Sequence, residues 1–215
     1  MAAGVGRRRV LGLLAGLGVA GAAAGWLGLR RPEAPPGRLT CGEERMDMAG
    51  RVLVAYATRA GSTAEVAERL CARGLLAKAK PVAKVVDLAS FDAVVLGSGT
   101  YYGAWLGPMT AFVQAQADGL RRMTVAFFTM HMQNQSDAPE AKAAREAYTA
   151  LVRALVILVE EAFFAGRVEP ARLSLLERLA VRFVGSPVGD FRDWPRIETW
   201  ADALSPRFVP LKVPA

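Results

Sequence analysis

One segment constrains this chain most: a short apolar run that ends in a hydroxyl-rich turn and opens into a helical pattern. The run, residues 51–57, is rich in β-branched and apolar residues, as a buried strand requires. The turn Thr58-Arg59-Ala60-Gly61-Ser62-Thr63 follows, and residues 64–77 then place apolar side chains at helical spacing. The segment therefore predicts a strand, a tight turn and a helix.

The same alternation continues to the C-terminal part of the chain. Further strands are predicted near residues 83–86, 93–97, 124–129 and 162–168, and further helices near residues 108–117, 140–159 and 170–184. Strands that alternate with helices imply a mostly parallel sheet that helices cover on both faces. The 215 residues, of which 53% are hydrophobic, suffice for about one such domain with additional segments, and they exclude a disordered or fibrous chain.

The first 49 residues form a separate part. Arg7, Arg8 and Arg9 precede twenty uncharged residues, 10–29, and Arg30 and Arg31 follow them. Twenty helical residues span about 30 Å, enough to cross a bilayer core. We predict a transmembrane anchor or an export signal, which resembles a twin-arginine signal, over residues 1–31, and a linker over residues 32–49. Basic residues flank both ends of the run, so the side of the membrane, cytoplasmic face or exported, stays open.

The composition excludes several classes of site. Two cysteines and one histidine are too few for a disulfide framework or a zinc site, so we expect no metal. Cys71 falls on the apolar stripe of the first predicted helix and is expected in the core. The net charge of +7 favours anionic partners. The basic residues do not gather with aromatic ones, so we do not expect nucleic acid.

Residues 170–184 combine apolar residues at helical spacing with Arg172, Arg178 and Arg182. A basic amphipathic helix of this kind can lie on an anionic membrane. The alternative is a surface helix whose apolar face packs on the sheet.

Two loops stand at strand ends, where ligands bind in parallel sheets. The turn at residues 58–63 offers hydroxyls, Arg59 and the backbone N–H groups of a helix start, which suit a phosphate. The alternative there is helix capping by Ser62 or Thr63. Residues 97–105 interleave three glycines with Tyr101, Tyr102 and Trp105, which suits a planar ligand or, alternatively, core packing.

These loops, in this order, resemble those of flavodoxin-like domains that bind flavin mononucleotide (FMN). Near the C-terminus, residues 164–167, 179–182 and above all the run Gly189-Asp190-Phe191-Arg192-Asp193-Trp194 resemble the menaquinone-dependent protoporphyrinogen dehydrogenases. The resemblance covers about residues 51–204. It implies a flavodoxin-like α/β fold: a doubly wound five-stranded parallel sheet, order 2-1-3-4-5, with helices on both faces, over residues 50–204, followed by a tail at residues 205–215.

The resemblance also implies FMN as the cofactor and a set of residues that bind it. The phosphate would be held by Thr58, Arg59, Ala60, Gly61, Ser62 and Thr63. The flavin ring would be lined by Thr100, Tyr101, Tyr102, Gly103, Ala104 and Trp105. A third loop would supply Phe128, Thr129, Met130, His131, Met132 and Gln133. The chain departs from the family at Tyr101, where the family has arginine, and at Met130-His131-Met132, where it has a smaller polar residue.

A flavin carries out electron transfer itself, so the protein needs only to bind, orient and tune it. His131 is the candidate catalytic residue, because an unperturbed imidazole titrates near neutral pH and could relay a proton. The alternative is a loop histidine bonded to the backbone. We predict a membrane-associated FMN oxidoreductase that acts on a quinone or porphyrin-like molecule. A flavodoxin-type electron carrier and a non-catalytic interaction module are the alternatives, and the oligomeric state stays open.

Overall fold

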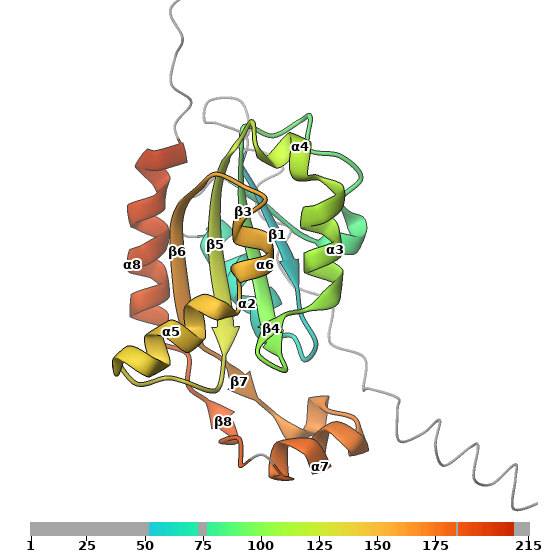
Figure 1. Ribbon diagram of the computed structural model, residues 1–215, viewed down its shortest axis with the longest axis vertical. Coiled ribbons are helices and arrows are strands. Elements are labelled where there is room, and N and C mark those ends of the chain that lie inside the picture. Colours follow the sequence, from blue (N-terminus) through green and yellow to red (C-terminus); the bar gives the residue numbers. More distant parts are fainter. Residues whose placement is uncertain (1–51, 73–76, 184, 209–215) are drawn as a thin grey trace, which may run out of the picture. The chain divides into compact units, whose positions relative to one another are not determined.

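The computed structural model describes residues 52–72, 77–183 and 185–208 (Figure 1). The predictions on residues 1–31 and 32–49 lie outside this part of the chain. The described residues divide into two compact units, one of residues 52–168 with 187–208 and a smaller one of residues 169–186.

A parallel sheet forms the centre of the larger unit. Its strands are β1 (Val52–Ala57), β2 (Ala77–Pro81), β3 (Ala93–Tyr101), β5 (Thr124–His131) and β6 (Leu158–Ala165). They lie in the order β2-β1-β3-β5-β6, and every neighbouring pair is parallel. Counted along these five strands the order is 2-1-3-4-5, as predicted. The short strand β4 (Ala104–Trp105) pairs antiparallel with the end of β3.

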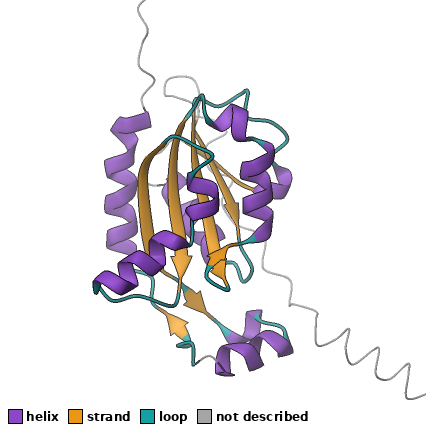
Figure 2. Ribbon diagram, viewed as in Figure 1, coloured by secondary structure: helices purple, strands orange, loops and turns teal. Residues whose placement is uncertain are grey.

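Helices cover both faces of this sheet (Figure 2). The side chains of β1 alternate, so Val52 and Val54 join one buried cluster, whereas Leu53 and Ala55 join another. The first cluster packs against α2 (Ser62–Leu70) and α8 (Trp194–Leu204). The second packs against α3 (Gly107–Ala115), α4 (Ala117–Leu120) and α6 (Ala150–Arg153). The predicted doubly wound α/β fold is therefore confirmed.

Two shorter elements complete the larger unit. The strands β7 (Arg167–Val168) and β8 (Gly189–Asp190) pair antiparallel after the end of β6. Residues 205–208 of the predicted tail form η4 (Ser205–Phe208), whose Phe208 is buried. Cys71 is buried at the end of α2, as expected.

The predicted strand at residues 83–86 is wrong, because the strand lies at Ala77–Pro81 and residues 82–84 form the 3₁₀ helix η2 (Val82–Lys84). As the strand at the edge of the sheet, β2 alternates small alanines with lysines, and it ends at Pro81, which lacks an N–H group for the ladder. The valine-rich stretch that follows, residues 82–86, is not a strand of the sheet. Val82 is buried against the sheet, and Val86 is exposed.

The predicted helix at residues 140–159 is wrong in its second half. The structure has α5 (Pro139–Ala147) and the short α6, and β6 already begins at Leu158. A turn at Tyr148 and Thr149, both buried, separates the two helices. The β-branched residues 156, 157 and 159 then favour an extended chain over a helix.

The smaller unit contains η3 (Pro170–Arg172) and α7 (Leu175–Phe183). Ser174 and Glu177 form a reciprocal capping box: Ser174 N–H donates to Glu177 Oε2 at 3.0 Å, and Glu177 N–H donates to Ser174 Oγ at 3.3 Å. No helix among the described residues is long and apolar enough to cross a membrane.

Candidate functional site

The three loops singled out in the sequence meet at the carboxyl edge of the sheet. A Cβ atom built on Gly99, near the end of β3, would lie 3.5 Å from Thr63 Oγ1 in α2. One built on Gly166, just after β6, would lie 3.5 Å from Met132 Sδ and 3.7 Å from Ser62 Oγ. The N–H of Gly166 also donates to the carbonyl of His131 at 2.9 Å. Segments that are far apart in the sequence thus form one continuous edge (Figure 1).

The first loop places an uncapped helix start at this edge. Gly61 is the N-cap of α2 and has φ of 90°, a left-handed conformation that glycine adopts without a Cβ penalty. Within the described part of the chain, no side chain caps this end of α2, and Ser62 and Thr63 belong to its first turn. Capping by Ser62 or Thr63 is therefore wrong. The N–H groups of a helix's first turn lack intrahelical acceptors, so this end can bind an anion.

Two hydroxyls beside these N–H groups are oriented by hydrogen bonds that they accept. Thr58 Oγ1 accepts from Gly61 N–H at 3.0 Å. Ser62 Oγ accepts from Arg167 N–H at 3.1 Å. Each hydroxyl still has its own proton to donate, which a phosphate oxygen can accept. Ala60 is half-buried in the same loop, and Thr63 is 2% exposed.

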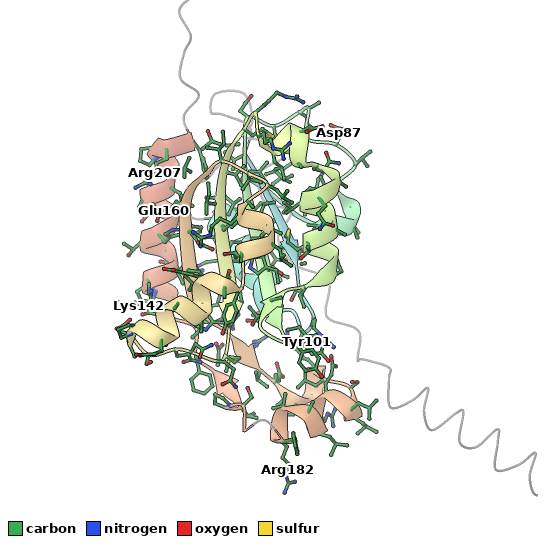
Figure 3. The ribbon with its side chains drawn as sticks, in the orientation of Figure 1. Asp87, Tyr101, Lys142, Glu160, Arg182 and Arg207 are labelled. Atoms are coloured by element: carbon green, nitrogen blue, oxygen red, sulfur yellow. The ribbon has the colours of Figure 1, made fainter. Side chains whose placement is uncertain are left out.

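The second loop presents exposed aromatic rings. Tyr101 is 44% exposed and Tyr102 is 87% exposed, and their ring centroids lie 4.2 Å apart. Figure 3 shows Tyr101 at the end of β3. Tyr102 has φ of 49°, a conformation that costs energy in a residue with a Cβ, and Gly103 follows with φ of 73°. An exposed, strained aromatic pair at a strand end is typical of a ligand site.

Arg59 joins the first loop to the second. Its guanidinium carbon lies 3.8 Å from the centroid of the Tyr101 ring, within cation–π distance. A positive charge thus stands at the second loop although position 101 itself is a tyrosine. The cation comes from the turn after β1.

Trp105 of the second loop and two residues of the third loop are part of the core. Trp105 is 4% exposed, packs on Phe127 with ring centroids 4.6 Å apart, and donates its indole N–H to Thr129 Oγ1 at 2.8 Å. Phe128 and Thr129 are fully buried. Ala104 is half-buried in β4, and the hydroxyl of Thr100 lies 3.5 Å from the carbonyl of Met130.

His131 is held inside the third loop. It is 5% exposed, and its Nδ1 lies 2.7 Å from the carbonyl of Gln133, so Nδ1 carries the proton and donates. Burial lowers the pKa of His131 below its usual value of 6.5, against the opposing effect of that hydrogen bond. The imidazole is therefore neutral at pH 7, which favours a loop histidine bonded to the backbone over a charged proton relay. Met130 is buried, Met132 half-buried and Gln133 exposed.

Four charged residues that sequence reasoning did not assign to the site adjoin the first loop. Glu65, in the first turn of α2, forms ion pairs with two arginines. Its Oε1 lies 2.5 Å from Arg167 Nη2, and its Oε2 lies 2.6 Å from Arg192 Nη1. Arg192 also binds Asp190 with two nitrogens. The run at residues 189–194 signalled that this segment matters, but nothing in the sequence indicated its partner.

The edge as a whole fits FMN. The uncapped first turn of α2, with its hydroxyls and Arg59, matches a phosphate, and the exposed Tyr101 and Tyr102 match a planar ring. Among the described residues there is no group of three or more histidine, cysteine or acidic side chains that could hold a metal ion.

Comparisons with known proteins agree with the fold and with FMN as the cofactor. The model of a family described as a flavodoxin domain matches residues 53–193. Over 57 residues, 26% of this chain, the sequence is 47% identical to an NAD(P)H dehydrogenase (quinone) of Afipia carboxidovorans. The matched stretch spans only 27% of that relative.

Solved structures with a similar arrangement include an archaeal flavodoxin, at 15% identity and a TM-score of 0.45 over 74% of this chain and 98% of that one. A flavoprotein of Lactobacillus acidophilus, solved in complex with FMN, is 14% identical with a TM-score of 0.43, over 54% of this chain and 93% of that one.

Proposed function

Because this chain belongs to the flavodoxin domain family, we propose that it is an FMN-dependent oxidoreductase that acts on a quinone or a porphyrin-like molecule. FMN is the cofactor that the family membership and the fit of the sheet edge support. The observation that carries the proposal is the juxtaposition of an uncapped helix start with an exposed tyrosine pair, joined by Arg59. When bound, FMN supplies the redox chemistry, since its ring system accepts and returns electrons.

The residues of the first loop would hold the phosphate. The N–H groups of Ser62 and Thr63 would donate to its oxygens, along with the hydroxyls of Thr58 and Ser62. Arg59 would add charge at the rim while its guanidinium keeps Tyr101 in place. Tyr101 and Tyr102 would flank the ring system and limit the access of water to it.

The substrate class rests on two observations. The short match with a quinone dehydrogenase favours a quinone as the electron acceptor and NAD(P)H as the donor. The run at residues 189–194, by its resemblance to protoporphyrinogen dehydrogenases, favours a porphyrin-like molecule. In the quinone reaction NAD(P)H gives up a hydride, one proton comes from solvent, and the quinone becomes a quinol.

The test begins with the full chain, loaded with FMN and passed through gel filtration. We expect flavin to be retained, and we expect Thr58→Val to weaken FMN binding. Thr110→Val, which removes a hydroxyl from α3 on the other face of the sheet, is the matched control. Loss of all flavin from the parent protein would refute the proposal and favour a non-catalytic interaction module.

Turnover then separates an enzyme from an electron carrier. An oxidoreductase should consume NAD(P)H in the presence of a water-soluble quinone, or oxidise a porphyrinogen with a quinone as acceptor. A carrier should take up electrons one at a time in an anaerobic titration and pass them to a protein partner without turnover of either small molecule. The net positive charge of the chain disfavours the electron-carrier alternative, because ordinary flavodoxins are acidic and dock on basic partners.

We propose in addition that the protein works at a membrane. The apolar run at residues 10–29 supports this as a tether. Helix α7 supports a second contact, because Leu175, Leu179 and Phe183 recur every four residues and are 57%, 63% and 92% exposed. Arg178 and Arg182 lie along the neighbouring stripe of the same helix, where they suit anionic headgroups.

Vesicle flotation tests the contribution of α7. With the full chain we expect Leu179→Asp to weaken binding to vesicles that contain anionic lipid more than to neutral ones. Leu151→Asp is the matched control, because Leu151 is a 73% exposed leucine on α6. Equal binding of both variants would refute a role for α7.

A further inference from the structure

The run Gly189-Asp190-Phe191-Arg192-Asp193-Trp194 has no role in the site described so far, yet it is tied to the first loop. Arg192 is the centre of this connection. Its Nε and Nη2 bind the two carboxylate oxygens of Asp190 at 2.7 and 2.5 Å, and its Nη1 binds Glu65 at 2.6 Å. Its guanidinium also lies 4.5 Å from the Trp194 ring. We call Glu65, Arg167, Asp190 and Arg192 the Glu65 cluster.

The Glu65 cluster binds α2 at its first turn, whose N–H groups are proposed to bind the phosphate. Glu65 follows Ser62 by three residues, and its N–H donates to Gly61 O at 3.1 Å as the first bond of the helix. One carboxylate oxygen is bound by Arg167 and the other by Arg192. The backbone N–H of Arg167 also donates to Ser62 Oγ. The cluster therefore fixes both the backbone and a hydroxyl of the first loop.

The burial of Arg192 restricts the geometry of the cluster. The side chain of Arg192 is only 4% exposed, and a buried guanidinium needs its carboxylate partners to offset the loss of water. The hydrogen bond from Arg192 holds the pKa of Asp190 below its usual value of 3.8, so this carboxylate stays charged at neutral pH. A planar guanidinium that binds one carboxylate with two nitrogens leaves little rotational freedom for the third contact, to Glu65.

We propose that Arg192 is a positioning residue for the phosphate loop: through Glu65 it sets the first turn of α2, so that the N–H and hydroxyl groups of residues 58–63 converge on the phosphate of FMN. The inference rests on the proposed assignment of that loop. It gives the most distinctive run of the C-terminal part a role in cofactor binding, and Arg192 takes this role without touching the cofactor.

A second ion pair attaches the other end of α2 to the larger unit. Arg69, in the last turn of α2, donates its Nε to Glu198 of α8 at 2.7 Å. This pair ties the other end of α2 to its neighbouring helix, two turns from the loop. Arg69→Gln is therefore a matched control, because it removes an ion pair from α2 and leaves the first turn intact.

The experiment compares the affinities of the full chain for FMN and for riboflavin, which has the same ring system without the phosphate. For Arg192→Gln we expect the ratio of FMN to riboflavin affinity to fall by about tenfold, equivalent to roughly 1.4 kcal/mol. Arg192→Lys should restore only part of the ratio, because an ammonium cannot make the three-way contact. Arg69→Gln should leave the ratio unchanged even where it lowers the melting temperature.

Glu65→Gln separates positioning from charge. If the cluster acts by geometry, this variant should also lower the ratio, since a neutral amide cannot hold two guanidinium groups. If it acts only through charge near the phosphate, removing a negative side chain should raise FMN affinity, and that result would overturn the inference.

Other outcomes are equally decisive. An unchanged ratio in Arg192→Gln, or equal losses for FMN and riboflavin, would also overturn the proposal. If Arg192→Gln fails to fold, Asp190→Asn tests the same proposal. Asp190 is 41% exposed, so this substitution should destabilise the fold less. We expect it to lower the ratio of FMN to riboflavin affinity. A parent protein that binds FMN no better than riboflavin would instead refute the phosphate loop itself.

Discussion

Replacing Gly97 with alanine should destabilise the protein in a way that the structure allows us to calculate. Gly97 lies in β3 beside Phe128 of β5, and the phenyl ring covers the space where a side chain would stand. A Cβ atom at position 97 would lie 1.9 Å from Phe128 Cζ and 2.1 Å from Cε1. The ring would have to move by about 1.5 Å to reach an ordinary contact of 3.4 Å.

Phe128 has little room for such a movement. It is fully buried, and its ring packs edge-on against Trp200 with centroids 6.3 Å apart. Overpacking of a tight core costs about 1–3 kcal/mol. Replacing a glycine by alanine also lowers the conformational entropy of the unfolded chain, which stabilises the protein by about 0.4–1 kcal/mol. We expect a net loss of about 1.3 kcal/mol, and a fall in melting temperature of about 3–5 °C for a domain of this size.

Urea unfolding followed by tryptophan fluorescence would measure this loss. Gly99→Ala is the control, since its Cβ would meet Thr63 Oγ1 at an ordinary 3.5 Å and should change the unfolding free energy by less than about 0.5 kcal/mol. The double variant Gly97→Ala with Phe128→Leu should lose less than the sum of the single losses, because the smaller side chain makes room. Strict additivity, or a Gly97→Ala protein as stable as its parent, would refute this account.

Three further predictions concern residues of the sheet edge. Thr129→Val should cost about 1–3 kcal/mol of unfolding free energy in urea, because the buried indole N–H of Trp105 loses its acceptor, whereas Thr129→Ser should keep most of it. Between pH 8 and pH 5 the parent should lose more stability than His131→Asn: burial places the folded pKa of His131 below the unfolded value of 6.5, so its contribution is present above that pH and declines as the pH falls. Thermal unfolding across this range would test it, and parallel curves would contradict it. Tyr102→Gly should raise the melting temperature of the FMN-free protein by relieving the strained φ of 49°, yet weaken FMN binding; a loss of both would show that the ring stabilises the fold.

The resemblance to flavodoxin-like domains predicted the order of the sheet, and the sequence located the central strands because their pattern is unambiguous. β1, β3 and β5 are buried on both faces and therefore appear as short apolar runs between turn residues. The edge strands carry a weaker signal. β2 is an alanine and lysine alternation that ends in proline, and β6 contains Glu160 and Glu161, so their positions depend on tertiary contacts.

The candidate site likewise contains some features that the sequence predicts and others that it does not. The loop at residues 58–63 could be predicted because its helix start, hydroxyls and glycine are consecutive in the chain. The pairing of Glu65 with Arg192 could not, since 127 residues separate them and only the packing of β8 and α8 brings them together. The cation–π contact of Arg59 with Tyr101 likewise depends on the meeting of two loops.

The ladder between β7 and β8 makes the smaller unit an exchangeable module. Val168 stands opposite Gly189, so the chain leaves and re-enters the larger unit at neighbouring points of one antiparallel pair. A two-residue hairpin turn could close the same gap. Residues 169–188 can therefore vary in length and chemistry while the sheet, its loops and Arg192 keep their places. In such an arrangement a single flavin scaffold can acquire a new location or a new partner without having to fold differently.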